Sequence, residues 1–230
     1  SHQDINVAEF ISVLIHVSEE CGKVIRNVAE TGGHKKQASK DDESPVTEAD
    51  LIVQKTIEVV LNKLYPTLRV EGEESAASIK DKKPAVNPDE IADKVKQFIK
   101  QDWLNSQHDK EELHQEQASL DLQDDAEIQV DHYETFNTKD AVVWIDPLDG
   151  TSDFVKENFS ACTVLIGLSV AGYSRIGVVH QPFTPDNMDE SATYFGTGEH
   201  GAYRLKYNKS MSMENATERT CEYLCPFDHE

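Results

Sequence analysis

AVVWIDPLDGTSD, residues Ala141 to Asp153, is the stretch that decides the fold. It opens with an apolar run from Ala141 to Ile145, rich in β-branched and aromatic residues, which predicts a buried strand. Pro147 has no N–H to donate, so we expect the ladder of this strand to end there and the chain to turn.

Acidic side chains stand on both sides of this break. A turn at the end of a strand can aim the carboxylates of Asp146 and Asp149, together with the Leu148 carbonyl, into one small volume, and hard cations prefer clustered oxygens. The small residues Gly150 to Ser152 follow, and their bare N–H groups at the start of a helical turn would suit an anion. A metal site beside a phosphate cradle is one interpretation. A solvated turn is the other, because Asp, Pro and Gly are ordinary turn residues.

The charge balance narrows the classes of partner. The chain of 230 residues has 22 Lys and Arg against 43 Asp and Glu, a net charge of −21. We therefore expect neither a nucleic acid polymer nor an anionic membrane as a partner. A small anionic substrate would also be repelled, so a phosphate ester would require bound divalent metal to invert the local field.

Cysteine usage and hydropathy bear on the compartment. Cys221 and Cys225 are close in sequence, but no second Cys or His pair accompanies them, which favours free thiols over a zinc site. No signal peptide is recognised, and the longest nearly apolar run, Ala161 to Gly172, is too short to span a bilayer. We expect a soluble cytoplasmic protein.

Two helices are expected in the first third of the chain. Val7 to Glu30 has apolar residues at the spacing of an amphipathic helix. Thr47 can cap a second helix, with Asp50 completing a capping box. From the local sequence alone, Asp50 is best interpreted as a helix-start residue favoured by the macrodipole.

Leu68 to Glu71 predicts a short strand that runs into Glu73 and Glu74. Paired glutamates after a strand and a glycine are either surface charge or metal ligands, and in isolation the former is favoured. From Ala76 to Asp140 the composition shifts to charged residues and glutamine, and Pro88 to Leu104 predicts one amphipathic helix. Asn105 to Asp131 is strongly acidic, which predicts a solvated excursion, helical or disordered.

The second half predicts a sheet meander. Its strands are expected at Ala161–Val170, Ile176–His180, Ser191–Gly196 and Gly201–Tyr207, with a turn at Ala171-Gly172-Tyr173. His180, at a strand end, is interpreted as a structural histidine rather than a catalytic one. Met211 to Glu230 shows no clear period.

Four ordered motifs carry a resemblance to a known family. They are TEAD at 47–50, VEGEES at 70–75, WIDPLDGTSDF at 144–154 and GVVHQPF at 177–183. In this order they resemble the lithium-sensitive, magnesium-dependent phosphatases related to inositol monophosphatase. Within that superfamily the chain looks most like the 3'(2'),5'-bisphosphate nucleotidase branch. Inositol polyphosphate 1-phosphatases also carry an insert before the aspartates, but typically have Ser where this chain has Gly150.

The resemblance implies an α+β fold, a layered α/β/α/β/α sandwich. It further implies one metal-binding domain over residues 1–230 with an acidic insert at about 76–140. Members of the family usually continue into a C-terminal lobe that supplies a Trp-Asp pair, and no Trp-Asp occurs here. We therefore expect either a fragment or a protein that lacks much of this lobe.

The resemblance also implies roles for individual residues. The metal ligands would be Glu73, Asp146, the carbonyl of Leu148 and Asp149, around two or three Mg²⁺ ions, the third lacking its Trp-Asp ligand. Thr151 would relay a proton from the attacking water, with Asp50 as its base. Phosphate oxygens would be held by the N–H groups of Gly150, Thr151 and Ser152, and Glu74 would support the ligands.

The implied activity is hydrolysis of a small phosphorylated substrate. It would be a magnesium-dependent, lithium-sensitive removal of the 3'-phosphate from adenosine 3',5'-bisphosphate, giving AMP and phosphate. An inositol polyphosphate 1-phosphatase is the alternative within the class. From another class, the chain could be a catalytically silent, phosphatase-like binding module.

Overall fold

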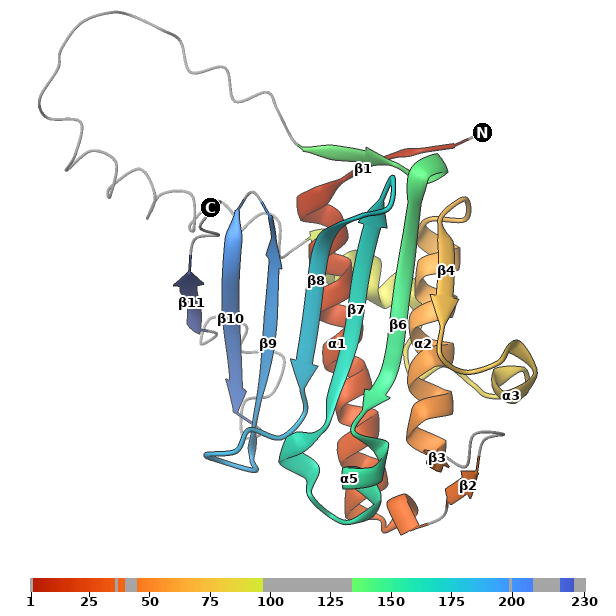
Figure 1. Cartoon of the computed structure of the whole chain (residues 1–230), viewed down its shortest axis with the longest axis vertical. Helices are drawn as coiled ribbons and strands as arrows, with labels where there is room; N and C mark the ends of the chain where they lie inside the picture. The colour runs from red at the N-terminus through yellow and green to blue at the C-terminus, as the bar shows by residue number, and fades with distance from the viewer. Residues whose placement is uncertain are drawn as a thin grey trace, which may run out of the picture.

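A computed structural model describes residues 2–35, 37–39, 45–96, 134–198, 200–208 and 220–225. Its main sheet has seven strands in the order β11-β10-β9-β8-β7-β6-β4 (Figure 1). Their bounds are β4 (Arg69–Gly72), β6 (Ala141–Asp149), β7 (Thr163–Val170), β8 (Tyr173–Gln181), β9 (Glu190–Thr197), β10 (Gly201–Asn208) and β11 (Thr220–Cys225). β4 and β6 pair in parallel, and the other neighbours are antiparallel, which makes the expected meander.

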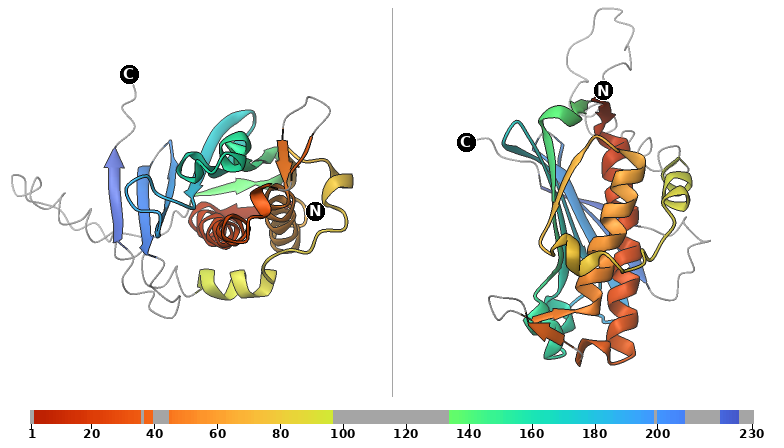
Figure 2. Two further views of the ribbon diagram at one scale, coloured as in Figure 1. Left: turned by 90° about the horizontal axis from the view of Figure 1, so that it is seen from below. Right: turned by 90° about the vertical axis from the view of Figure 1, so that its right-hand side faces the viewer.

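Two long helices cover one face of the sheet. They are α1 (Val7–Glu30), which has the predicted bounds, and α2 (Glu48–Leu64). Helical residues 88–96 lie beyond this pair, so all three helices are on the same side of the sheet (Figure 2). The predicted α+β class is confirmed, and the described residues form one helix layer and one main sheet of the α/β/α/β/α sandwich that the resemblance implies.

Smaller elements complete the described fold. β1 (Asp4–Asn6) pairs with β5 (Thr135–Asn137), and β2 (Gln37–Ser39) pairs with β3 (Pro45–Thr47). Short helices are α3 (Ala76–Ile79) and α5 (Thr151–Val155), with 3-10 turns at Gly33–Lys35, Thr138–Asp140 and Phe159–Ala161. In the described part of the chain, no helix has both the length and the apolar character needed to cross a membrane.

Alternation along the strands divides the side chains between two faces. One cross-strand row is buried against the helices and consists of Ile145, Ile166, Val178 and Phe195. The neighbouring row, on the opposite face, consists of Trp144, Gly167, Gly177 and Gly196. We call these the covered face and the open face.

Two details of β6 correct the sequence interpretation. The strand does not end at Pro147 but continues to Asp149, which pairs with Thr163 after a register irregularity. A bulge tolerates proline because it needs no ladder N–H there. The run from Ala141 is also not buried throughout, since Trp144 is 54% exposed. An apolar run alone does not show which face of a strand is covered.

Two further boundaries differ from the predictions. β8 begins at Tyr173, which pairs with Val170, so the hairpin turn has only Ala171 and Gly172, both at positive φ. A two-residue turn with both residues at positive φ matches the right-handed twist of the flanking strands. β11 falls in the stretch for which no period was recognised.

The range 76–140 is described only at its two ends. Ile79, Val86, Ile91 and Val95 from the first end are buried, as is Phe136 from the second. The predicted helix from Pro88 to Leu104 is helical over residues 88–96, and the remainder lies outside the described residues. The expectation for Asn105 to Asp131 also falls outside them.

Candidate active site

Asp50 joins the start of α2 to the loop after β6. Its side chain is fully buried, and Oδ2 accepts hydrogen bonds from the N–H (2.8 Å) and the hydroxyl (2.6 Å) of Thr47. Its other oxygen, Oδ1, accepts from the Thr151 hydroxyl at 3.0 Å. Burial raises the pKa of Asp50, and the hydrogen bonds from Thr47 and Thr151 partly oppose that rise. The predicted capping box is therefore confirmed, and the same carboxylate also holds a predicted site residue.

Gly150 makes the turn that leads from β6 into α5. Its φ is +84°, in the left-handed region, and a Cβ there would lie 3.1 Å from the Ala161 carbonyl oxygen. Both constraints favour glycine. The first N–H groups of a helix have no intrahelical partner, so this geometry is compatible with the phosphate cradle expected at Gly150, Thr151 and Ser152. Their role stays a prediction.

The Thr151 hydroxyl has two acceptors within reach. Its oxygen is 3.0 Å from Asp50 Oδ1 and 2.9 Å from the Leu148 carbonyl oxygen. A hydroxyl has one hydrogen and therefore donates to one of them at a time, leaving its lone pairs to accept from a third group such as water. Thr151, Asp50 and the Leu148 carbonyl thus meet at one point, and their catalytic and metal-binding roles stay predictions.

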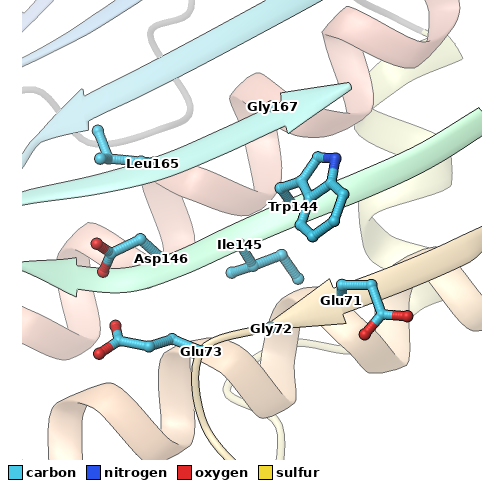
Figure 3. A pocket seen from close by; sticks show the side chains of 8 residues that line it. All are labelled: Glu71, Gly72, Glu73, Trp144, Ile145, Asp146, Leu165 and Gly167. Carbon is cyan, nitrogen blue, oxygen red and sulfur yellow. The ribbon is translucent and has the colours of Figure 1, made fainter. Parts of the chain in front are cut away.

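Glu73 and Asp146 face each other at one end of a surface pocket (Figure 3). Asp146 Oδ1 accepts from the Leu148 N–H at 3.2 Å. The pKa of the Asp146 carboxyl is raised to about 7 by burial, then by the charges of Glu73 and Asp149 and by a hydrogen bond with Glu73. Three predicted metal ligands, one from the loop after β4 and two from β6, therefore act on one another electrostatically.

The fit of these residues to Mg²⁺ can be tested on their chemistry. The carboxylates supply hard oxygen donors, which suit Mg²⁺. They also repel one another, and a bound divalent cation would relieve that repulsion. However, among the described residues no group of three or more His, Cys, Asp or Glu side chains is gathered closely enough to hold an ion. The donor set therefore fits magnesium, although the side chains do not already form a cage. The ligand assignment stays a prediction.

Sequence reasoning missed Gln54, which fixes the loop that carries the glutamates. Its side-chain oxygen accepts from the Glu74 N–H at 2.7 Å, and its Nε2 donates to the Glu74 carbonyl at 2.7 Å. A Cβ at Gly72 would lie only 2.3 Å from the Gln54 amide carbon, so glycine is required where the amide packs. Glu73 is tied to β6 by its own N–H, which donates to the Ile145 carbonyl.

One signal in the sequence could have indicated Gln54. It lies one turn after Asp50, between the buried positions Val53 and Ile57 of the core stripe. A buried amide at such a position needs a partner, because burial without hydrogen bonds is costly. Glu74 itself is buried, and its backbone is what Gln54 contacts, which agrees with a supporting place rather than a first ligand.

The pocket extends from these carboxylates along the open face. Its volume is about 410 Å³, and its lining residues are Glu71, Gly72, Glu73, Trp144, Ile145, Asp146, Leu165 and Gly167. Figure 3 shows the Glu73 and Asp146 carboxylates at one end and the Trp144 indole farther along β6. The pocket is thus a groove that runs over β6 from the two carboxylates toward the indole.

Other candidates for chemistry are structural. His180 is buried and shares a 2.8 Å hydrogen bond with the Thr193 hydroxyl, which confirms the structural interpretation. Burial lowers the pKa of His180 to about 3 and keeps it neutral. The Cys162 thiol lies near the loop, but burial and nearby carboxylates raise its pKa to about 12. Cys21 is also buried and free, whereas the side chains of Cys221 and Cys225 lie outside the described part.

A protein-family model described as "Inositol monophosphatase family" matches residues 6–230. Among curated proteins, 3'(2'),5'-bisphosphate nucleotidase 1 of Dictyostelium discoideum is 27% identical over 190 residues, 80% of this chain and 50% of that protein. The Homo sapiens protein of the same name is 27% identical over 170 residues, 73% of this chain and 44% of its own length. Putative inositol monophosphatase 3 of Drosophila melanogaster is 45% identical over 49 residues, 21% of this chain and 14% of that protein.

Solved structures show a partial likeness. CysQ from Bacteroides thetaiotaomicron is 19% identical with a TM-score of 0.46, over 92% of this chain and 56% of that chain. The extragenic suppressor protein suhB from Bartonella henselae is 16% identical with a TM-score of 0.47, over 84% and 50%. The chain spans about half the length of the two nucleotidases it matches.

Proposed function

Because the chain belongs to the inositol monophosphatase family, we propose that it hydrolyses phosphate monoesters with Mg²⁺ as cofactor. The proposed substrate is adenosine 3',5'-bisphosphate, from which the 3'-phosphate is removed to give AMP and phosphate. The observation that carries the proposal is the 3.0 Å hydrogen bond from Thr151 to the buried Asp50, beside the facing carboxylates of Glu73 and Asp146.

Glu73, Asp146 and Asp149 would hold Mg²⁺, with the Leu148 carbonyl as a further oxygen. When bound, such ions neutralise charge on the phosphoryl oxygens and make water a stronger nucleophile. Without a cation, the raised pKa of Asp146 favours a shared proton between carboxylates. The affinity for metal should therefore increase as the pH rises to about 7 and this proton is lost, and it should level off at higher pH.

Thr151 and Asp50 handle the proton of the attacking water. The Thr151 oxygen accepts a hydrogen bond from the water while its own hydrogen is directed to Asp50. A threonine hydroxyl is a weak base, so it can relay a proton only because a carboxylate lies behind it. Burial raises the pKa of Asp50 and makes that carboxylate a stronger proton acceptor than one in water.

Two named nucleotidases, each aligned over about three quarters of this chain, support a nucleotide substrate. The 45% identical segment of a putative inositol monophosphatase favours an inositol phosphate as the second candidate. A phosphate site of the kind proposed would serve either class. The choice depends on the groove beyond the carboxylates.

The test is phosphate release from adenosine 3',5'-bisphosphate and from inositol 1,4-bisphosphate, each with Mg²⁺ and with EDTA. We expect magnesium-dependent release from the nucleotide and much slower release from the inositol ester. Faster release from the inositol ester would mean that an inositol phosphate, and not the nucleotide, is the substrate. No release from either ester by folded, magnesium-saturated protein would refute the enzyme proposal and leave a silent binding module.

A further inference from the structure

Gln54 is a buried amide whose hydrogen-bonding groups are all engaged. It is 1% exposed, and its Nε2 donates both to the Glu74 carbonyl at 2.7 Å and to Glu58 Oε1 at 2.8 Å. Its Oε1 accepts from the Glu74 N–H at 2.7 Å. An amide nitrogen has two hydrogens, and a carboxylate can only accept, so Glu58 fixes which end of the amide is which. The amide cannot turn over without losing its bonds to Glu74.

The backbone that carries Glu73 is held on both sides of this residue. Before it, Gly72 lies so close to the Gln54 amide that a Cβ there would be 2.3 Å from the amide carbon. After it, the Glu74 N–H and carbonyl are both bonded to Gln54. The N–H of Glu73 itself donates to the Ile145 carbonyl of β6 at 3.1 Å. Three consecutive residues are therefore fixed by contacts that involve no bound ion.

One helix supports both halves of the proposed site. Asp50 and Gln54 lie one turn apart in α2 and are both buried. Asp50 accepts from the Thr151 hydroxyl in the loop after β6, whereas Gln54 binds the backbone of Glu74 in the loop after β4. The position of the glutamate loop relative to Thr151 is thus set by α2.

We propose that Gln54 is a positioning residue that sets the affinity of the site for Mg²⁺ by holding Glu73 opposite Asp146 before the ion binds. This inference rests on the proposed function, which takes Glu73 and Asp146 as ligands. The two carboxylates face each other (Figure 3) and repel when both are ionised, and the bonds of Gln54 keep the glutamate loop from moving away. Ligands that are already ordered make binding less costly in entropy.

Magnesium binding gives a direct test without substrate. Gln54→Met keeps the length of the side chain but removes its three hydrogen bonds, and isothermal titration with MgCl₂ should show a Kd that is about 10- to 100-fold higher. Thr56→Val is the matched control. Thr56 is a buried polar residue of the same helix, but it holds the Ala85 N–H, at 2.9 Å, and no part of the glutamate loop. Thr56→Val should lower the thermal stability and leave the Kd for Mg²⁺ within about twofold.

A second variant reaches the same contact from the other side. Gly72→Ala leaves Gln54 in the chain but should displace its amide from Glu74, so it should weaken Mg²⁺ binding as Gln54→Met does. In both variants the Mg²⁺ concentration for half-maximal phosphate release should rise with the Kd. At saturating Mg²⁺ the kcat should recover to within about threefold of wild type, because Gln54 does not touch the reacting atoms.

Hydrogen exchange tests the ordering of the loop in the unaltered protein. In EDTA the Glu74 N–H should exchange at least about 100-fold more slowly than an exposed amide, since its bond to Gln54 does not depend on the ion. Exchange at the rate of an exposed amide would overturn the inference whether or not the variants fold.

The outcomes separate this inference from the function beneath it. Phosphate release with the same Kd for Mg²⁺ in wild type and Gln54→Met would overturn the role of Gln54 and keep the phosphatase. Weaker Mg²⁺ binding in Gln54→Met but not in Thr56→Val, without phosphate release from wild type, would support that role and refute the phosphatase. Equal weakening in both variants would reflect general loss of stability and overturn the inference.

Discussion

The two faces of the sheet use the same strands for opposite purposes. On the covered face, Ile145, Ile166 and Val178 form a buried row against the helices. One residue along, the open face presents Trp144 and Gly167, and then Asp146. Alternate residues of β6 therefore pack the core and line the groove, so a substitution should affect either stability or activity according to its face.

The two faces also shift the pKa values of their ionisable groups in opposite directions. His180 on the covered face is held neutral by burial, with a pKa of about 3. Asp146 on the open face has a pKa raised to about 7 by burial and by neighbouring carboxylates. The first group is satisfied without a ligand through its bond to Thr193, whereas the second favours a proton or a cation.

The largest effect is expected at Asp146. Asp146→Asn should lower kcat by about 1000-fold, because it removes a charge from the proposed ion site, which supplies several kcal/mol in such reactions. Thermal unfolding in EDTA should be unchanged or shifted upward, since carboxylate repulsion is relieved. Asp140→Asn, the same change at the exposed residue just before β6, is the control and should affect neither measurement. A near-native rate for Asp146→Asn would mean that the open face is not the site.

Thr151 should show the next largest effect. Thr151→Val keeps the shape of the side chain but removes the hydroxyl that Asp50 holds, so we expect kcat to fall roughly 100-fold. Thr151→Ser retains the hydroxyl and should recover most of the rate at saturating Mg²⁺. If serine and valine variants are equally slow, Thr151 contributes packing and not a proton relay.

A pair of glycines tests the covered face against the open one. In Gly22→Ala the new Cβ would lie 2.1 Å from His180 Nε2, so we expect a loss of about 2–3 kcal/mol in unfolding free energy, despite alanine's better helix propensity. At Gly177, on the open face, a Cβ meets nothing within 4 Å, and Gly177→Ala should change stability by less than about 0.5 kcal/mol. Urea denaturation measures both, and equal losses would contradict the division into two faces.

The smallest effect is the pH dependence of stability in EDTA. For His180 the folded pKa of about 3 lies below the unfolded value of 6.5, so its contribution is complete above pH 6.5 and declines as the pH falls. Between pH 7 and pH 5 the contribution of His180 alone should fall by about 2 kcal/mol, which is best measured in an Asp146→Asn background. His180→Gln should remove that dependence.

Asp146 should contribute a pH dependence of stability that is opposite in sign to that of His180. Its folded pKa of about 7 exceeds the unfolded value of 3.8, so its contribution is complete below the unfolded pKa and is lost as the pH rises toward 7. Asp146→Asn or added Mg²⁺ should abolish the part of the pH dependence of stability that comes from Asp146. The same slope in wild type and both variants would show that neither group governs the pH response.

Periodicity and local chemistry predicted much of this fold. The apolar spacing of α1 and the capping box of α2 could be read directly, because both depend on residues within a turn or two of each other. The exposure of Trp144 could not, since the alternation in a strand does not reveal which face the helices cover. Nor could the bulge at Pro147, which depends on pairing with β7.

Part of the candidate site could also be predicted from the sequence. The motif around Asp146 indicated clustered oxygens, and the resemblance linked it to Asp50 and Glu73. Gln54 was missed because its partner, the backbone of Glu74, is 20 residues away and carries no side-chain signal. Tertiary hydrogen bonds to backbone groups leave no pattern in the sequence beyond a polar residue on a buried stripe.

The double attachment of Asp50 bears on how inactive relatives should be recognised. One of its oxygens completes the cap of α2 and the other holds Thr151. Evolution could abandon catalysis in a descendant and still retain this aspartate, because the fold would suffer from its loss. Replacement of Thr151 by a residue without a hydroxyl would therefore indicate the loss of catalysis more reliably than the state of Asp50 does.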